Sequence, residues 1–234
     1  MNLLRGFPKY IEAIYKKFND SNHELYLVGG SIRNLLLYKD IKDWDMTTDA
    51  TPEQILKLFP NAFYDNQFGT VGVPVILGRS ETTTPESDSG QARMTQKMVV
   101  EITTFRTEKG YSDKRRPDSV EWGKSIEEDL ARRDFTINAI AMQCHPERNE
   151  GSKITLIDPF NGQQDIKDKI IRAVGNPKER FKEDALRLLR AIRIAAELSF
   201  SIEENTWKEI ISDAPLIKEV SGERIRIELL RILR

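Results

Sequence analysis

The chain has 234 residues, 39% of them hydrophobic, so it is long enough to bury a substantial core. No apolar run approaches the ~20 residues that cross a bilayer, and the N-terminal segment lacks the apolar centre of a secretory signal. The formal net charge of −1 supplies no overall cationic field for a nucleic acid, and the single cysteine, Cys144, excludes an internal disulfide and fits a reducing cytoplasm.

The first predicted elements lead to a pair of glycines. Hydrophobic spacing predicts a packing helix over residues 8–18, a short strand over residues 25–28 and a helix over residues 31–37. Gly29 and Gly30 join that strand to that helix. Glycines let a backbone approach a ligand closely, and the free amides at a helix N-terminus suit an anion such as phosphate.

Two carboxylates follow at Asp43 and Asp45. Alternate side chains of an extended chain share a face, so the two acids project the same way, and a hard divalent cation relieves their repulsion. Alone, a glycine turn is usually only a tight turn, and such an acid pair is usually solvated. Together they provide what metal-assisted attack on a nucleoside triphosphate needs.

The middle of the chain alternates between strands and polar stretches. We predict a helix beginning at residues 51–53, a strand pair or one bent strand over residues 68–77, and a strand over residues 98–106. Glu101 in that last strand is a candidate third catalytic carboxylate, or else an acid that faces water. Polar insertions are expected near residues 78–97 and 144–153, with His145 as a solvated loop residue.

Two basic groups follow. The loop predicted over residues 107–118 carries basic side chains that could contact RNA phosphates, although such a run is usually only solvated; they are Lys114, Arg115 and Arg116. The next segment, 129–142, is predicted to be a helix. Arg133 near its start either forms a structural salt bridge or meets a triphosphate. A final strand is expected over residues 154–162.

Beyond residue 165 the pattern is helical. In a predicted helix over residues 183–196, polar side chains recur at every third position and form a stripe; they are Asp184, Arg187, Arg190 and Arg193. The stripe is either a salt-bridged solvated face or a surface for a nucleotide. In the second interpretation, aspartate accepts from an exocyclic amine while arginine donates to base or phosphate.

Taken in order, the sequence blocks resemble the class II tRNA nucleotidyltransferase (CCA-adding enzyme) and bacterial poly(A) polymerase family. They are LVGGSIRN, KDWDMTTDATP, VEITTFR, GYSDKRRPDSV, EEDLARRDFTINAIA, IDPFNG and RFKEDALRLLRAIRIAAELSF. The resemblance covers nearly all of the chain except the two insertions. It implies an α+β fold, with a polymerase-β-type head over residues 1–163 whose small mixed β-sheet is flanked by helices, and an all-helical neck over residues 164–234.

The resemblance also implies an activity. Asp43 and Asp45 would hold Mg²⁺ while an RNA 3′-hydroxyl attacks the α-phosphate of CTP or ATP and releases pyrophosphate. Asp184 and Arg187 would read the base in place of a template. The other implied nucleotide-binding residues are Gly29, Gly30, Arg33, Arg133, Arg190 and Arg193.

Three features depart from the family pattern. Asn34 stands where the family usually has aspartate, the insertion at residues 78–97 interrupts the sheet region, and the chain ends about where the family continues into body and tail domains. CCA, CC or A addition to tRNA is the favoured interpretation. The alternatives are a poly(A) polymerase, or a truncated or split nucleotide- and RNA-binding module that needs a C-terminal partner chain.

Overall fold

A mixed β-sheet forms the centre of the N-terminal part of the computed structural model, which describes residues 7–66, 69–76, 97–109, 119–123, 125–145 and 153–233. Within these residues the strand order is β3-β4-β5-β2-β1-β8-β9. Only β2 and β5 are parallel; the other neighbours are antiparallel. The strands are β1 (Leu25–Val28), β2 (Asp45–Thr48), β3 (Phe63–Asn66), β4 (Thr70–Ile76), β5 (Lys97–Thr104), β8 (Ala141–His145) and β9 (Lys153–Ile157).

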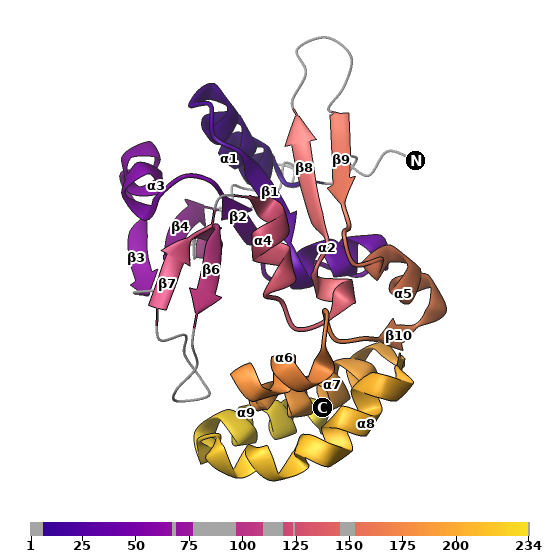
Figure 1. Cartoon of the computed structure of the whole chain (residues 1–234). Helices are drawn as coiled ribbons and strands as arrows, with labels where there is room; N and C mark the ends of the chain where they lie inside the picture. The colour runs from indigo at the N-terminus through magenta and orange to yellow at the C-terminus, as the bar shows by residue number, and fades with distance from the viewer. Residues whose placement is uncertain are drawn as a thin grey trace, which may run out of the picture.

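Helices and a separate hairpin surround this sheet, as Figure 1 shows. The helices of the head are α1 (Lys9–Asp20), α2 (Gly29–Leu36), α3 (Pro52–Leu58), α4 (Ile126–Ala131) and α5 (Gly162–Asp168), and the hairpin pairs β6 (Arg106–Lys109) with β7 (Ser119–Trp122). Strand β1 is buried on both faces because its side chains alternate between two apolar cores. Leu25 and Leu27 join the larger core with α1, whereas Tyr26 and Val28 join the smaller core with α4.

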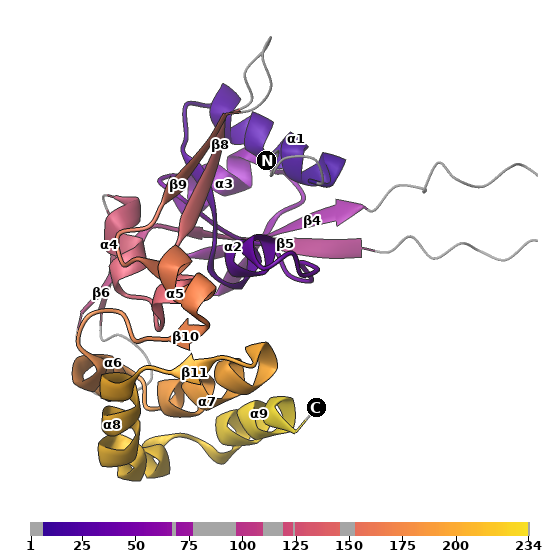
Figure 2. The ribbon, with the colours of Figure 1, turned by 90° about the vertical axis from the view of Figure 1, so that its right-hand side faces the viewer.

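The neck lies beneath the head and consists mainly of helices (Figure 2). These are α6 (Pro177–Glu183), α7 (Leu186–Leu198), α8 (Glu204–Asp213) and α9 (Gly222–Ile232), with a 3₁₀ turn over Ala214–Glu219. A two-residue parallel pair, β10 (Ile170–Ile171) with β11 (Ser201–Ile202), is the only β-pairing within the described neck residues. The predicted α+β class and the helical neck are otherwise confirmed.

The predicted helix over residues 129–142 is wrong. Helix α4 ends at Ala131, a 3₁₀ turn spans Thr136–Asn138, and β8 begins at Ala141. The chain leaves the helix because Phe135 pairs with Ala173 in an isolated bridge, and the Asp134 carboxylate accepts a hydrogen bond from the Phe135 amide. Tertiary pairing has overridden the local helical spacing.

The predicted helix over residues 183–196 is also interrupted. Helix α6 ends at Glu183 and α7 begins at Leu186, with Asp184 in an extended conformation between them. The Asp184 carboxylate accepts a hydrogen bond from the Leu186 amide, which satisfies a donor at the start of α7. Of the stripe residues, Asp184 therefore lies in the connection between α6 and α7, and the three arginines lie in α7.

Strands extend further than the sequence predicted. Cys144 is buried in β8, and His145 belongs to the same strand, so the polar segment begins later than residue 144 and the predicted loop position of His145 is wrong. The predicted loop over residues 107–118 likewise begins inside β6, which ends at Lys109. The strand predicted over residues 68–77 is the single strand β4, paired with β3 and β5.

Candidate active site

Ser31 fixes the acid pair at the start of the second strand. Asp45 is the first residue of β2 and Asp43 lies in the bend before it. The Ser31 hydroxyl, on the first turn of α2, accepts a hydrogen bond from the Asp45 amide at 2.8 Å and donates one to the Asp43 carbonyl at 2.7 Å. Neither carboxylate accepts a hydrogen bond from the described residues, so the backbone is held while the side-chain oxygens stay available.

The glycine turn meets the second acid at close range. Gly29 has a φ of +66°, a conformation that favours glycine, and a Cβ there would lie 3.1 Å from Arg133 Nη1 and 3.4 Å from Asp45 Oδ2. A Cβ at Gly30 would lie 3.6 Å from Arg33 Nη2 and 3.8 Å from Asp45 Oδ2. The turn thus places one carboxylate and two guanidinium groups around the same short stretch of backbone.

Burial raises the pKa of Asp45 above its ordinary value. Arg133 opposes that shift, and the neighbouring charge of Asp43 adds to it. Two acids brought together in a partly buried site repel each other, and a bound cation would relieve the repulsion. The oxygen donors, their orientation and this electrostatic strain all fit a hard divalent ion such as Mg²⁺.

Arg33 has a hydrogen-bonding partner in Asn34. Its Nε and Nη2 donate to Asn34 Oδ1 at 3.2 and 3.0 Å, and its Nη1 donates to Asn138 Oδ1 at 2.9 Å. Burial lowers the pKa of Arg33 from its ordinary value. Asn34 therefore orients the guanidinium without adding a negative charge beside it.

Arg133 forms the structural salt bridge that was one of its two predicted roles. Its Nη2 donates at 2.9 Å to Asp129, a fully buried acid that also accepts from Arg132 at 2.6 and 3.0 Å. Burial alone would raise the pKa of Asp129, but the two arginines hold it below its ordinary value. The Arg133 Nε is buried and donates to none of the described residues.

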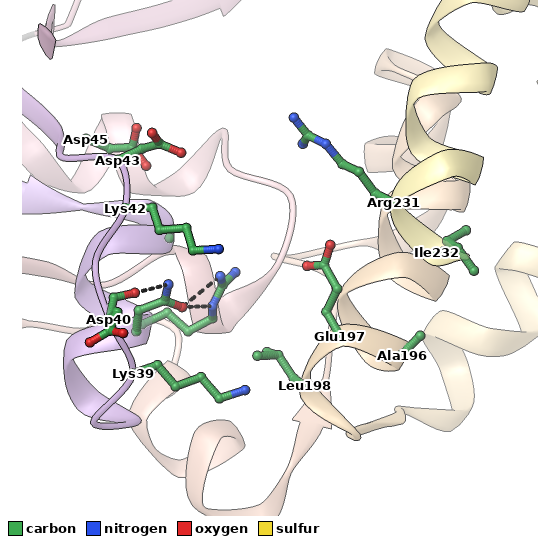
Figure 3. Close-up of a pocket in the computed structure, with 13 residues that line it drawn as sticks. Lys39, Asp40, Lys42, Asp43, Asp45, Ala196, Glu197, Leu198, Arg231 and Ile232 are labelled. Carbon is green, nitrogen blue, oxygen red and sulfur yellow. Dashed lines mark hydrogen bonds between the residues drawn. The ribbon is translucent and has the colours of Figure 1, made fainter. Parts of the chain in front are cut away.

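A cleft of about 950 Å³ opens beside the acid pair (Figure 3). Its head side carries Gly30, Arg33, Asp43 and Asp45, together with the lysines and acid of the loop over residues 39–42. Arg231 and Glu197 project into it from α9 and α7. The cleft is therefore a polar space between head and neck, with both predicted metal ligands on one wall.

A smaller hollow of about 220 Å³ also reaches Asp45. In the parallel register of β2 and β5, Asp45 lies directly opposite Glu101, so both side chains project from the same face of the sheet. Arg133 lines this hollow as well. Among the described residues, no three acidic, histidine or cysteine side chains gather closely enough to hold a metal ion. The catalytic role of Glu101 stays a prediction.

Each arginine of the neck stripe already has an acidic partner. Arg187 pairs with Glu183 at 2.5 Å, Arg190 with Asp134 at 2.6 Å, and Arg193 with Glu228 at 2.5 Å. Asp184 accepts from Arg224 of α9 at 2.8 and 3.2 Å, not from Arg187. The stripe thus fastens the neck together and to the head, and its residues line neither of the two hollows.

Two of these contacts dock the neck on the turn after α4. Arg187 Nη2 donates at 3.1 Å to the Arg132 carbonyl, and Arg190 donates through Nε and Nη2 to buried Asp134. Burial alone would raise the pKa of Asp134, but Arg190 and the hydrogen bond from Asn138 hold it far below its ordinary value. The ion pair between Arg190 and buried Asp134 is a polar contact between head and neck that the sequence did not reveal.

Several site residues were missed from the sequence because nothing local marks them. Ser31 is an unremarkable polar residue on a predicted helix, and Asn138 and Asp134 lay in a segment expected to be helical. Their functions depend on partners far away in the chain. The basic loop residues Lys114, Arg115 and Arg116 lie outside the described residues.

The fold and the acid pair at the glycine turn define a polymerase-β-type nucleotidyltransferase head. Residues 25–172 match the family described as "Poly A polymerase head domain", and residues 199–234 match "Probable RNA and SrmB- binding site of polymerase A". The chain belongs to the poly A polymerase head-domain family. The proposed head boundary at residue 163 stays a prediction.

Similar proteins are CCA-adding enzymes. That of Lactobacillus helveticus is 42% identical over 219 residues, which cover 94% of this chain and 48% of that protein. That of Geobacillus thermodenitrificans is 40% identical over 228 residues, which cover 97% of this chain and 50% of that protein. The chain thus spans about half the length of these relatives.

Solved structures agree with this relationship. The crystal structure of the Bacillus stearothermophilus CCA-adding enzyme in complex with CTP is 36% identical with a TM-score of 0.75, covering 97% of this chain and 49% of that one. The Thermotoga maritima CCA-adding enzyme complexed with tRNA_CCA is 27% identical with a TM-score of 0.70, and the match covers 99% of this chain and 49% of that one. Among the described residues, no helix is long and apolar enough to cross a membrane.

Proposed function

We propose that this chain carries the catalytic half of a template-independent RNA nucleotidyltransferase that adds CMP and AMP from CTP and ATP to a tRNA 3′ end. The observation that carries the proposal is the Ser31 clamp, which fixes Asp43 and Asp45 beside the glycine turn. The CTP and tRNA complexes of similar CCA-adding enzymes supply the substrate class. They favour CCA addition over poly(A) addition.

In the proposed reaction, the RNA 3′-oxygen bonds to the α-phosphorus as the bond to the β-phosphate breaks, and pyrophosphate leaves. Asp43 and Asp45 would hold Mg²⁺, which, when bound, lowers the pKa of the hydroxyl and offsets charge on the leaving group. The Gly29 and Gly30 backbone and the Arg33 and Arg133 guanidinium groups would cradle the triphosphate.

We assign Glu101 as the candidate acceptor of the 3′-hydroxyl proton. It is exposed on β5 and lies opposite Asp45 in the sheet register, so it is within one strand spacing of the acid pair. A carboxylate in this position can take a proton without holding the metal. Cys144, buried in β8, takes no part in this chemistry.

We retain Asp184 and Arg187 as the base-reading pair, with Arg190 and Arg193 as further nucleotide contacts. Asp184 is paired with Arg224, and Arg187 is paired with Glu183. A base would therefore bind by replacing Arg224 and Glu183 as the hydrogen-bonding partners of Asp184 and Arg187. Hydrogen bonds to charged groups are strong enough to support such an exchange. Selection between CTP and ATP would then depend on how the region between α6 and α7 adjusts.

We propose that firm binding of tRNA needs the further length that the CCA-adding relatives have, as a continuation of the same polypeptide or as a separate partner chain. The proposed site for nucleotide chemistry lies within this chain, whereas the relatives are about twice as long. We propose the cytoplasm as the compartment of the protein. A module that binds nucleotide and RNA without catalysis is the second candidate.

The test is incubation of the purified chain with tRNA lacking its 3′-CCA, Mg²⁺ and labelled CTP or ATP, with and without the C-terminal half of a relative. The proposal expects label on the RNA 3′ end, at greater yield when the C-terminal half is present. Absence of label in both arms would favour the non-catalytic module. A long tract of A residues added without CTP would favour a poly(A) polymerase.

A further inference from the structure

A third hollow, of about 280 Å³, lies at the opposite end of β1 from the glycine turn. Strand β1 begins at Leu25, which lines the hollow, and is followed by Gly29 beside the acid pair. Gln143 and Cys144 line it from β8, the antiparallel neighbour of β1. None of the residues that line this hollow lines the cleft beside Asp45 or the smaller hollow. It is therefore a separate space on the head.

Three buried side chains form the inner wall of the hollow. Tyr15 of α1, Leu25 and Cys144 line it, and each is less than a tenth exposed. The Tyr15 hydroxyl donates a hydrogen bond at 3.3 Å to the Met142 carbonyl, which ties α1 to β8. A wall made of a phenol ring, an aliphatic chain and a thiol offers a fixed apolar surface to a flat ligand.

The rim of the hollow carries carboxamides. Asn19 and Asn22 come from the end of α1 and the turn after it, and Gln143 comes from β8. None of these three side chains hydrogen-bonds to another of the described residues. Each carboxamide has a donor and an acceptor side by side, and in nucleic-acid recognition this pair of groups bonds to the edge of a base. The rim is thus equipped for a nucleobase.

The formal charge at the hollow is negative. Glu24 lines it, and among the described residues no lysine or arginine does. The Asp49 carboxylate accepts a hydrogen bond from the Glu24 amide at 2.8 Å and lies 3.3 Å from Nδ1 of His23, a further lining residue. One oxygen of Glu24 accepts from the Tyr26 hydroxyl at 3.0 Å. A phosphate would be repelled here, whereas the exocyclic amine of a base can donate to the carboxylate.

We propose that this hollow binds one nucleobase that bears an exocyclic amine, cytosine or adenine, at a site distinct from the active site. At about 280 Å³ it is just below the ~300 Å³ at which pockets for drug-sized ligands begin, so it has room for a base and its ribose. The base lies on the inner wall, with its edge toward the carboxamides and its amine toward Glu24. It comes from a free nucleoside or from a nucleotide of RNA. The site uses neither of the acids proposed to hold Mg²⁺, so it goes beyond the proposed function and is independent of it.

The test compares two ligands that differ at the edge of the base. Cytidine has an amine where uridine has a carbonyl, and neither carries a phosphate. In the ¹⁵N-labelled full chain, cytidine is expected to shift the amide resonances of Asn22 and Gln143 and to leave that of Gly30 unmoved. Uridine should bind at least about tenfold more weakly, because its carbonyl oxygen would face the Glu24 carboxylate.

A pair of variants checks the carboxamide rim. Gln143→Leu removes the polar groups of the side chain and keeps its bulk, so it is expected to weaken cytidine binding about fivefold. Asn61→Ala, which removes an exposed carboxamide elsewhere on the head, is the matched control and should leave the affinity unchanged. Unaltered cytidine binding in Gln143→Leu would remove the rim from the site and overturn the proposal.

The wild-type chain gives a second readout that needs no variant. Cys144 is the only cysteine of the chain and lies on the inner wall, so a bound base should cover it. Burial raises the pKa of its thiol to about 11, so its reaction with iodoacetamide is slow enough to follow. Cytidine should slow this reaction further, and uridine at the same concentration should not.

The trinucleotide UpCpU distinguishes the two sources of the base. Tighter binding of UpCpU than of cytidine, with shifts at Asn22 and Gln143, would identify RNA as the source, and weaker binding would identify a free nucleoside; both results support the site. Equal affinity for cytidine and uridine, shifts at Gly30 in place of Gln143, or an unprotected Cys144 would each overturn it. Failure to incorporate nucleotides, by contrast, would contradict the proposed function and leave this site unaffected.

Discussion

The Ser31 hydroxyl accepts a hydrogen bond from the Asp45 amide at 2.8 Å, and through it the first turn of α2 is tied to the first residue of β2. The same oxygen donates to the Asp43 carbonyl. One side chain thus holds the backbone of both proposed metal ligands, and the two glycines that precede it lie close to the Asp45 carboxylate.

Ser31→Ala is expected to lower the apparent Mg²⁺ affinity about tenfold, because supporting hydrogen bonds around ligands typically contribute 10–100-fold. It should also lower the free energy of unfolding by about 1–3 kcal/mol, since the Asp45 amide loses its partner. Activity against Mg²⁺ concentration and urea unfolding measure the two effects. Thr51→Ala, which removes the N-cap of α3 and costs about 1 kcal/mol, is the control that should leave the Mg²⁺ dependence unchanged.

Asp43→Ala combined with Asp45→Ala is expected to reduce incorporation by about 10³-fold or more, because metal charge stabilisation contributes several kcal/mol. The pKa of Asp45 is raised in the folded state, so its charge destabilises the fold at pH values above its unfolded pKa of about 3.9. Asp45→Asn should therefore raise the melting temperature at neutral pH without Mg²⁺ while abolishing activity. Full activity in the double variant would refute the metal assignment. Glu12→Gln, at an exposed position of α1, serves as the stability control.

Asp134→Asn is expected to lower the free energy of unfolding by about 3 kcal/mol, the lower end for a broken buried pair, since the Arg190 side chain is 37% exposed. The folded-state pKa of Asp134 is lowered, so its contribution is present above the unfolded pKa of about 3.9 and is lost as pH falls below it. Urea unfolding measured between pH 3 and about 7 should show that the free energy of unfolding falls less at acid pH in the variant than in the wild type. Asp20→Asn, in an exposed pair with Lys16, should cost less than about 1 kcal/mol.

Asp184→Asn and Arg187→Lys are expected to change the ratio of kcat/KM for CTP and ATP by about tenfold or more, because each alters the donors or acceptors offered to the base. Competition between labelled CTP and ATP on one RNA measures this ratio. Glu203→Gln, which alters the N-cap of α8, controls for a general loss of neck stability. If both variants kept the wild-type ratio, Asp184 and Arg187 would have no part in base reading.

Asn34→Asp is expected to keep or increase activity, by about threefold at most, because it adds a charged partner to hydrogen bonds that Arg33 already makes. The measurement is kcat/KM for CTP at fixed RNA concentration. Asn34→Ala, which removes the acceptor altogether, should lower it about tenfold. Equal values for the two variants would show that Asn34 does not orient Arg33.

The sequence was sufficient to predict those parts of the site whose residues lie close together in the chain. The strand over residues 25–28 and the helix after it are confirmed, although α2 begins at Gly29, so both glycines lie in its first turn. Of the two acids expected on one extended stretch, Asp45 begins β2 and Asp43 lies in the bend before it. The partners of the neck stripe were not predictable. Asp134, Glu228 and Arg224 pair with it from 35 to 56 residues away, and no spacing rule specifies such a distance.

By itself, the sequence determined the helical pattern beyond residue 165 and the acid pair after two glycines, since both follow from hydrophobic period or from residues a few positions apart. The α+β class was implied by the resemblance of its sequence blocks to a known family. Only the tertiary structure decided that residues 129–142 leave the helix, because Phe135 pairs with Ala173 and Asp134 pairs with Arg190. It alone also decided that Asp45 is shared by two hollows. That position depends on the parallel register of β2 with β5, two strands that are far apart in the chain.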